Sequence, residues 1–297
     1  MRRVGILFNA NIAAAPGLAQ SLAKKLQQSG VSVWAYPASD EARAGEELAG
    51  TEMILSLGGD GTMMRAARLA APEAIPILGI NLGNLGFTTE ISGREALTRI
   101  SSFLNGESWT DERAMLQAEL PESCPGYVDR VRTRSTDYGD GKSVIHALND
   151  VVVGRGSIIR VIRVKASVDG QPVTTYKGDG VIVATATGST GYSLASGGPI
   201  LFPSAEEILL TPIAPHLSLA TSLVLSPQSL VELEVRTAHE ARVSIDGQLE
   251  LPLRSGDTVR IRRSPYTTRL LRIQPRSFFH QTLLQKLSAR GGSADED

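Results

Sequence analysis

The stretch Glu52-Met-Ile-Leu-Ser-Leu-Gly-Gly-Asp-Gly-Thr62 decides the fold of the first part of the chain. Glu52–Leu57 is apolar enough to predict a buried strand, and it runs directly into the glycine-rich turn Gly58-Gly-Asp-Gly-Thr62. Met63–Ala71 then has the pattern of a helix. A strand, a glycine-rich turn and a helix in this order are typical of an open α/β sheet, whose ligands bind at the carboxyl ends of parallel strands.

The sequence on both sides of this stretch repeats the alternation of strands and helices. Apolar runs predict further strands at Val4–Phe8, Val31–Tyr36 and Ile75–Ile80. One helix is predicted from Pro16 to a stop at Gly30, and another follows a capping box formed by Ser92 and Glu95. Residues 1–110 are therefore predicted to form an α/β domain with an open, mostly parallel sheet. The apolar helix faces are Leu18, Leu22 and Leu26 in the first helix and Leu97, Ile100 and Leu104 in the second.

From about Trp109 the pattern changes to short runs rich in Val, Ile and Thr, many of which alternate with polar residues. Turn signals separate them, at Asp169-Gly170, Asp246-Gly247 and Ser255-Gly-Asp257. Residues 111–276 are therefore predicted to form a β-rich, sandwich-like domain of antiparallel strands. The predicted strands are Ala147–Val153, Ile159–Val168, Gly180–Ala186, Ser229–Val235, Ala241–Ile245 and Thr258–Arg262.

Three segments have their own predictions. The stretch 121–143 combines Pro, Gly, Ser and many charges, and we expect an exposed hairpin or mobile loop there. Phe278–Leu287 has the pattern of a short amphipathic helix, so residues 277–290 are expected to pack back onto the first domain. The polar residues 291–297 are expected to be a disordered tail.

Composition excludes several classes of function. The chain of 297 residues has 30 Lys plus Arg against 31 Asp plus Glu, a net charge of -1, so we expect neither a nucleic acid nor a membrane as partner. A single cysteine, Cys124, excludes an intrachain disulfide, and the four histidines show no metal-ligand spacing. The apolar start of the chain is short and holds Asn9, which favours a strand over a signal peptide. A cytoplasmic location is predicted.

The turn that contains Asp60 points to phosphate chemistry. Glycines allow the backbone to approach a ligand closely, and the following helix directs its N–H groups at the same place. A carboxylate in a loop that only held phosphate would repel it. Asp60 therefore suits a general base for an attacking hydroxyl, or a ligand for the magnesium that accompanies phosphates. A tight turn in which Asp60 caps the helix is the structural alternative.

Other polar segments follow or precede predicted strands. Asn81-Leu-Gly-Asn-Leu-Gly-Phe87 places a second glycine-rich turn after a strand, and Asn149-Asp150 offers an amide and a carboxylate that suit adenine and ribose. Lys177-Gly-Asp-Gly180 leads into a buried strand. Thr187-Gly-Ser-Thr-Gly-Tyr-Ser-Leu-Ala-Ser-Gly-Gly-Pro199 leaves that strand with more hydroxyls and amides than a turn needs for geometry alone.

The order of these motifs, together with Gly197-Gly-Pro199, Pro215-His216 and Asp246-Gly-Gln248, resembles the NAD kinase family over nearly the whole chain. The resemblance implies NAD bound between a nucleotide-binding first domain and an NAD-binding second domain, in a homodimer or homotetramer. It also implies that Asp60 takes the proton of the 2′-hydroxyl of the adenosine ribose, which attacks the γ-phosphorus of ATP. Mg²⁺ would be bound mainly through the triphosphate, with no dedicated protein cage.

The family's functional residues transfer to matching positions of this chain. The implied phosphate-donor loop is Gly58, Gly59, Gly61 and Thr62. The implied nucleotide-binding residues are Asp60, Gly61, Arg65, Phe87, Asn149, Asp150, Arg160, Lys177, Asp179, Thr190, Gly191, Tyr192, Ser193, Leu194, Ala195, Ala214 and Gln248.

The chain departs from the family pattern at a few positions. Asp150 stands where Glu is common, Gly191 where Ala is usual, Ala186 where Pro is usual and Lys177 where Arg is frequent. None of these changes removes a functional group from the motifs.

Three rival functions fit the motifs less well. A lipid kinase shares the first motif but not the loop Thr187–Pro199, and a dehydrogenase would need Gly-x-Gly-x-x-Gly after the first strand, where Phe8-Asn-Ala-Asn-Ile-Ala13 stands. A non-catalytic nucleotide sensor would be expected to lack Asp60. Residue types leave the donor open between ATP, another triphosphate and polyphosphate, and the acceptor between NAD and NADH.

Overall fold

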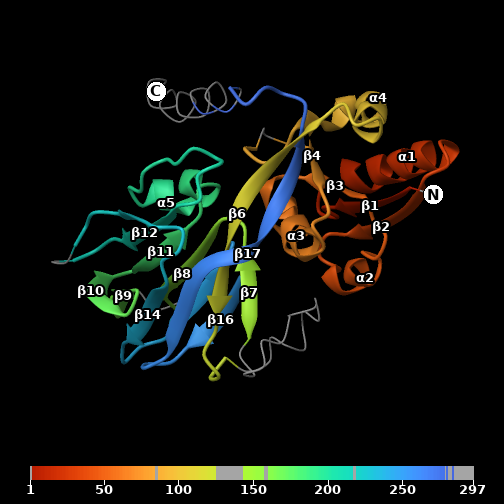
Figure 1. The fold of residues 1–297 in the computed structure, drawn as a ribbon. Coiled ribbons are helices and arrows are strands. Elements are labelled where there is room, and N and C mark those ends of the chain that lie inside the picture. The colour runs from red at the N-terminus through yellow and green to blue at the C-terminus, as the bar shows by residue number, and fades with distance from the viewer. Residues whose placement is uncertain are drawn as a thin grey trace, which may run out of the picture.

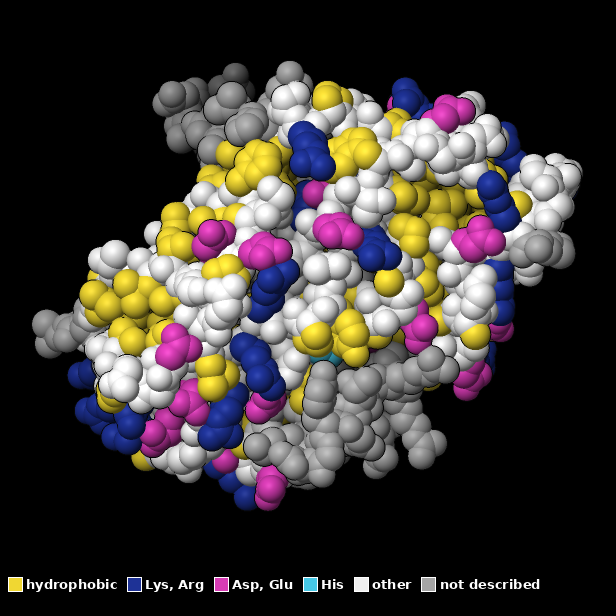
Figure 2. Space-filling model, in the orientation of Figure 1, with side chains coloured by type: hydrophobic (Ala, Val, Ile, Leu, Met, Phe, Trp, Pro, Cys, Tyr) yellow, Lys and Arg dark blue, Asp and Glu magenta, His cyan; other side chains and the backbone are white. Residues whose placement is uncertain are grey.

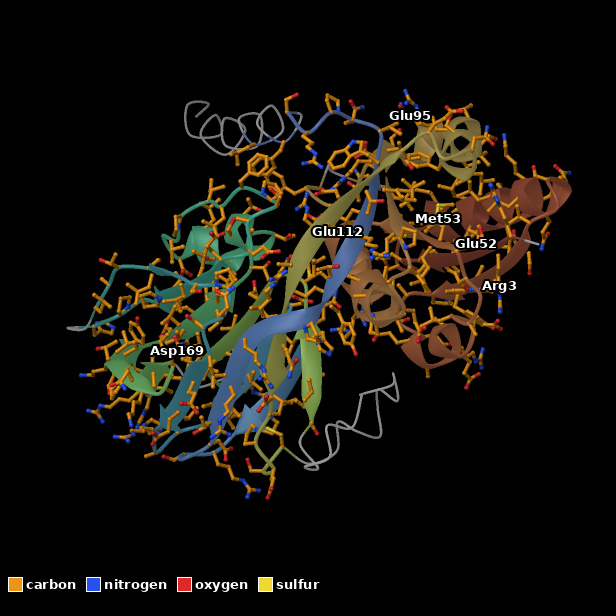
Figure 3. The ribbon with its side chains drawn as sticks, viewed as in Figure 1. Arg3, Glu52, Met53, Glu95, Glu112 and Asp169 are labelled. Carbon is orange, nitrogen blue, oxygen red and sulfur yellow. The ribbon has the colours of Figure 1, made fainter. Side chains whose placement is uncertain are left out.

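The computed structural model describes residues 2–83, 86–124, 143–156, 160–216, 219–277, 279 and 283. Two halves lie side by side and are joined by long central strands (Figure 1). Figure 3 places Glu112 on one of these strands between the halves, with Arg3 and Glu52 in the N-terminal half and Asp169 in the C-terminal half. Within the described part of the chain, no helix is long and apolar enough to cross a membrane.

The N-terminal half contains an α/β sheet with the strand order β4-β3-β1-β2, all parallel, and β5 adds to β4 in the same direction. Alternate residues of the buried strands face opposite sides, so Ile54 packs with α3 and α2 while Leu55 packs with α1 and α4. The elements are β1 (Arg3–Phe8), α1 (Ala14–Gln28), β2 (Ser32–Pro37), α2 (Glu41–Glu46), β3 (Met53–Gly58), α3 (Asp60–Ala70), the 3₁₀ turn η1 (Ala71–Glu73), β4 (Ile77–Asn81), β5 (Ile91–Ser92) and α4 (Gly93–Leu104).

The C-terminal half is an antiparallel β-sandwich. One layer has the order β13-β12-β11-β8-β15-β16, and the other consists of β10-β9-β14-β17 with β6 and β7. Alternating residues of both layers form one buried core, for example Val151 of β8 and Val259 of β17. The elements are β6 (Trp109–Glu119), β7 (Val144–Ala147), β8 (Asp150–Arg155), β9 (Ile162–Val168), β10 (Gln171–Gly178), β11 (Gly180–Ala184), η2 (Gly188–Thr190), α5 (Tyr192–Ala195), β12 (Ile208–Ile213), β13 (Leu223–Leu225), β14 (Val231–Arg236), β15 (Ala241–Ile245), β16 (Leu249–Leu253) and β17 (Thr258–Arg272).

A single strand carries the sheet from one half into the other. β17 pairs antiparallel with β14 and β6, and it also pairs parallel with β4 where Leu270 lies beside Ile77. The predicted boundary between residues 110 and 111 falls within β6, and the domain limits stay a prediction. The fold class itself, a mostly parallel α/β sheet followed by an antiparallel sandwich, is confirmed.

Three predicted element bounds were wrong in informative ways. The strand predicted over Ala147–Val153 is split, because Asp246 binds the backbone N–H groups of residues 148–150. The strand predicted over Thr258–Arg262 continues to Arg272 through a β-bulge. The helix predicted from Met63 begins at Asp60.

Some other predictions are confirmed, and some concern segments outside the described residues. The capping box of Ser92 and Glu95 is confirmed, and both Asp169-Gly170 and Asp246-Gly247 form turns with positive φ at both residues. The predicted helix Phe278–Leu287 lies outside the described residues except for its positions 279 and 283. Most of the predicted loop, residues 125–142, and the tail 291–297 also lie outside them.

Candidate functional site

Two glycine-rich segments meet at one edge of the parallel sheet. β3 ends at Gly58, which lies beside Asn81 at the end of β4. Gly59 is the N-cap of α3, and Asp60 is its first residue. The free N–H groups of a helix N-terminus therefore lie at the carboxyl ends of two parallel strands, which is where open α/β sheets bind phosphate groups.

The Asp60 carboxylate is held through one of its two oxygens. Oδ1 accepts hydrogen bonds from the Thr88 hydroxyl at 2.5 Å and the Thr88 backbone N–H at 3.3 Å. Oδ2 has no hydrogen-bond partner within the described ranges of the chain. Gly86 packs so closely that a Cβ at this position would lie 2.3 Å from Oδ1, so only glycine fits beside the carboxylate. The arrangement leaves one carboxylate oxygen for an incoming hydroxyl or cation.

A cavity of about 760 Å³ lies beside the first turns of α3. Met64, one helical turn after Asp60, forms part of its wall, and so do Gly191 and Tyr192 of the Thr187–Pro199 loop. This volume is within the range that holds drug-sized and cofactor-sized ligands. The remaining lining residues are Asn149, Asp150, Val152, Gly154, Arg155, Gly156, Asp179, Ile213, Arg242, Ser244, Asp246, Gly247 and Glu250.

Asn149 contributes an amide oxygen that has no hydrogen-bond donor among the described residues. Its Oδ1 is buried without a hydrogen bond from any described residue, while Nδ2 lies 3.6 Å from the sulfur of Met64. A buried amide oxygen without a donor costs free energy unless a ligand supplies one. The Asn149 side chain is therefore suited to accept a hydrogen bond from the edge of a base.

Asp246 fixes the backbone on which Asn149 and Asp150 lie. Its carboxylate is buried and accepts N–H bonds from Leu148 at 3.0 Å, Asn149 at 2.7 Å and Asp150 at 3.2 Å. The Asp246 N–H in turn donates to the carbonyl of Asp150. Burial raises the pKa of Asp246, and those N–H donors act in the opposite direction.

Asp150 is a buried carboxyl beside a second one. Burial, with a smaller contribution from Asp246, raises the pKa of Asp150 to about 7. An unfolded aspartate titrates near pH ~4, so the folded protein binds this proton more tightly than the unfolded chain does. The contribution of Asp150 to the free energy of unfolding is therefore largest at low pH and falls as the pH rises from about 4 to about 7.

This coupling predicts a pH-dependent effect of Asp150→Asn. The variant is expected to gain free energy of unfolding relative to wild type as the pH rises, because it removes a carboxylate that is costly to ionise in place. Urea denaturation of both proteins at about pH 5 and about pH 8 measures the difference. If the difference in free energy of unfolding between the two proteins were the same at both pH values, it would contradict the raised pKa of Asp150.

The β15–β16 turn connects the two halves at the site. The Gln248 side chain donates to the carbonyl of Gly61 at 2.5 Å and accepts from Arg68 at 3.0 Å. Arg68 and Arg65, both on α3, pair with Glu41 at 3.1 Å. Gln248 thus contacts the first turn of α3, while Arg65 is engaged with α2.

The Thr187–Pro199 loop packs directly against Asn149. A Cβ on Gly188 would lie 2.1 Å from the Asn149 carbonyl oxygen, so the two backbones are in direct contact. Ser193 is fully buried and bonds Thr211 at 3.1 Å, which directs its hydroxyl into the protein. Tyr192 is 48% exposed and lines the cavity.

Gly188→Ala is expected to reduce kcat/KM by at least 10-fold, because the Asn149 backbone must shift to admit the methyl group, and a shift of about 1 Å can cost that much or more. The matched control is Gly191→Ala in the same loop, where the nearest atom would be 3.3 Å away. Steady-state kinetics of the two variants provide the comparison. Equal reductions in kcat/KM in the two variants would show that contact with the Asn149 backbone does not cause the loss of activity in Gly188→Ala.

Several residues predicted from sequence are not part of the wall of this cavity. Lys177 lines a separate cavity of about 170 Å³ with Arg163 and Arg236. Phe87 lines another cavity of about 390 Å³, opposite Phe279. Thr190 bonds its own loop at the carbonyl of Thr187. No cavity wall described here includes Arg160, Leu194, Ala195 or Ala214.

The sequence did not reveal every residue that shapes the site. Thr88 follows the Asn81–Phe87 motif directly, so extending that motif by one residue would have included it. Asp246 belonged to a quoted motif, but its role as an acceptor for three N–H groups depends on tertiary structure. Among the residues that the structure covers, no group of three or more His, Cys, Asp or Glu side chains could hold a metal ion.

A helix N-terminus at the edge of a parallel sheet, a carboxylate with one oxygen unbonded among the described residues and an adjoining cavity of nucleotide size are features of a nucleotide-binding site. Comparison with known sequences identifies the family of the protein. Residues 4–108 match the ATP-NAD kinase N-terminal domain, and residues 148–273 match the ATP-NAD kinase C-terminal domain. The chain belongs to the NAD kinase family.

Curated relatives match over nearly their whole length. An NAD kinase of Dehalococcoides mccartyi is 41% identical over 292 residues, with 98% of each chain covered. An NAD kinase of Chloroflexus aurantiacus is 37% identical over 287 residues, covering 97% of this chain and 99% of the relative.

Two solved structures share the fold. A yeast NADH kinase complexed with NADH has a TM-score of 0.76 at 20% identity, and covers 100% of this chain and 89% of its own. An NAD kinase from Archaeoglobus fulgidus in complex with ATP has a TM-score of 0.72 at 24% identity, with 95% and 97% covered.

Proposed function

We propose that this enzyme transfers the γ-phosphoryl group of ATP to the 2′-hydroxyl of the adenosine ribose of NAD, which gives NADP and ADP. The observation that carries the proposal is the cavity beside α3, where the amide oxygen of Asn149, which no described residue bonds, lies next to Asp150. Together they offer an acceptor for the amino edge of adenine and a carboxyl for ribose hydroxyls. Membership of the NAD kinase family supports the same acceptor.

Asp60 is the proton acceptor in this proposal. Its Oδ2 takes the proton of the 2′-hydroxyl as the ribose oxygen forms a bond to the γ-phosphorus, and the bond from that phosphorus to the bridging oxygen of ADP breaks. The hydrogen bonds from Thr88 to Oδ1 fix the orientation of the carboxylate. The loop of Gly58, Gly59, Gly61 and Thr62, with the N-terminus of α3, receives the donor phosphates.

A divalent cation is consistent with this donor set. Mg²⁺ prefers oxygen ligands and is commonly held by substrate phosphates with one or two carboxylates and water. Oδ2 of Asp60 has no hydrogen-bond partner among the described residues, but this proposal assigns it to the ribose hydroxyl, so the cation would be held by triphosphate oxygens and water. Bound through the triphosphate, the cation would neutralise phosphate charge.

The regiochemistry can be tested with two NAD analogues. NAD that lacks the 3′-hydroxyl of the adenosine ribose is expected to be phosphorylated. NAD that lacks the 2′-hydroxyl of the same ribose is expected to inhibit competitively against NAD without being consumed. Mass spectrometry of the reaction products distinguishes these outcomes. Phosphorylation of the analogue that lacks the 2′-hydroxyl would contradict the proposed acceptor.

Asn149→Ala is expected to raise the KM for NAD on the order of 10-fold and to leave the KM for ATP unchanged, because one hydrogen bond to the acceptor's base is lost. Asn105→Ala, at the exposed C-terminal end of α4, serves as the matched control. Steady-state kinetics with each substrate varied in turn give both constants. A change confined to the KM for ATP would reassign the cavity to the donor.

The remaining residues inferred from the family keep the status of proposals. Arg160, Lys177 and Ala214 lie outside the wall of the main cavity. The homodimer or homotetramer implied by the family resemblance is likewise a proposal. Light scattering of the purified protein measures that assembly. Figure 2 shows acidic and basic side chains interspersed over one face of the molecule. The cytoplasmic location also stays a prediction.

A further inference from the structure

A buried ionic cluster lies where β6 and β17 run side by side. It consists of Asp111 and Arg113 on β6, Arg272 at the end of β17, and Glu90 before β5. The exposed fractions are 9% for Asp111, 5% for Arg113 and 6% for Arg272. Burying charges is expensive even when they are paired, and well-packed apolar residues often stabilise such a place as well or better. The cluster therefore calls for an explanation beyond stability.

Arg272 directs its guanidinium at the segment that follows the second glycine-rich turn. It donates hydrogen bonds to three successive carbonyl oxygens, those of Phe87 at 3.3 Å, Thr88 at 3.2 Å and Thr89 at 3.1 Å. Two carboxylates, Glu90 at 3.1 Å and Asp111 at 3.2 Å, hold the same guanidinium. One side chain thus fixes the backbone of residues 87–89.

The segment bound by Arg272 is the one that holds Asp60. Thr88 donates both its hydroxyl and its backbone N–H to Oδ1 of Asp60. The carbonyl of Thr88 accepts from Arg272, so a single residue connects the guanidinium and the carboxylate. The planar fork of an arginine is suited to such multiple contacts, which a lysine cannot reproduce.

We propose that Arg272 is a positioning residue for phosphoryl transfer, acting through Thr88 on the Asp60 carboxylate. By fixing residues 87–89, Arg272 keeps Thr88 on Oδ1 and leaves Oδ2 directed to the substrate hydroxyl. This inference rests on the proposed role of Asp60 as proton acceptor. A misplacement of about 1 Å at a reacting group can cost roughly 100-fold in rate, which sets the size of the expected effect.

The first test compares kinetic constants. Arg272→Gln is expected to lower kcat about 10- to 100-fold, with the KM for NAD within about 3-fold of wild type, because binding contacts remain and only the base is displaced. Arg272→Lys is expected to recover less than half of the loss on a logarithmic scale, because it keeps the charge without the fork. A KM effect with unchanged kcat would overturn the proposal.

Thr88 provides a test that does not disturb the buried ions. Thr88→Val keeps the shape and is expected to lower kcat about 10-fold, because the Asp60 carboxylate loses the hydroxyl donor that orients it. Thr88→Ser retains the hydroxyl and is expected to restore kcat. Equal behaviour of the Val and Ser variants would overturn the proposal.

Combining variants separates this inference from the function on which it rests. If Arg272 acts through Thr88 and Asp60, the losses in Arg272→Gln and Thr88→Val are expected to be non-additive, and Arg272→Gln is expected to have little further effect on an Asp60→Asn enzyme. If the losses in kcat multiply fully in the combined variants, Arg272 does not act through Thr88 and Asp60, and the proposal is overturned. If Asp60→Asn kept its activity, the proposed role of Asp60 would fail instead. Urea denaturation confirms that each variant is folded.

Discussion

Asp60→Asn is expected to lower kcat by about 10² to 10⁴, the range that a positioned general base contributes. Asparagine has nearly the same shape and can still accept the hydrogen bonds of Thr88 at Oδ1. It cannot take a proton at the position of Oδ2. The loss should therefore appear in kcat, measured by the initial rate of NADP formation with NAD and ATP both saturating.

The matched control for Asp60→Asn is Asp40→Asn. Asp40 is the N-cap of α2, so it is another carboxylate at a helix N-terminus in the same half of the molecule. Asparagine caps helices as well as aspartate does, and we expect kcat to remain within about 2-fold of wild type. If Asp60→Asn kept most of its kcat, the carboxylate would not be the proton acceptor. Its role would then be to contact the phosphates or the cation.

Asp246→Ala is expected to lower the free energy of unfolding by about 3 kcal/mol or more. The substitution leaves three backbone N–H groups without their acceptor in the interior, and each unsatisfied buried donor costs about 1 to 3 kcal/mol. Part of that cost is offset because the repulsion with Asp150 disappears. Urea denaturation at neutral pH measures the change. Because Asn149 and Asp150 lose their anchor, the KM for NAD is expected to rise as well.

The β9–β10 hairpin supplies the control for Asp246. Asp169 occupies the same kind of Asp-Gly turn, with φ of 51° against 52° for Asp246, but it is exposed and accepts one backbone N–H, from Leu230. Asp169→Ala is expected to cost about 1 kcal/mol. If the two alanine variants were equally stable, the anchoring role of Asp246 would have to be abandoned.

Local pattern predicted most of the fold because the core strands are buried and apolar. The strand through Leu57 and the helix after it follow from hydrophobic periodicity and a glycine-rich turn, and both are present. β17 was predicted too short because Pro265 interrupts its pattern, yet a bulge between Arg263 and Thr267 accommodates the proline. The split between β7 and β8 depends on Asp246, which is distant in sequence, so no local pattern could indicate it.

The candidate site could be predicted where its residues stand in short motifs. Asp60, Asn149 and Asp150 each stand next to a strand end in a recognisable segment, and the structure places Asn149 and Asp150 in one cavity wall with Met64 of the Asp60 helix. Arg272 gives no such signal, because a basic residue in an alternating strand is ordinarily exposed. Its burial and its contacts with residues 87–89 arise only when β17 crosses the sheet.

The most direct test of the proposed function is the reaction itself. Purified protein is incubated with NAD, ATP and Mg²⁺, and NADP is followed with an NADP-specific dehydrogenase. We predict that NADP forms only when all three components are present and that its formation is abolished in Asp60→Ala. Absence of NADP from well-folded protein, with NADH as acceptor and polyphosphate as donor also tried, would contradict the assignment of this chain as an enzyme that phosphorylates NAD.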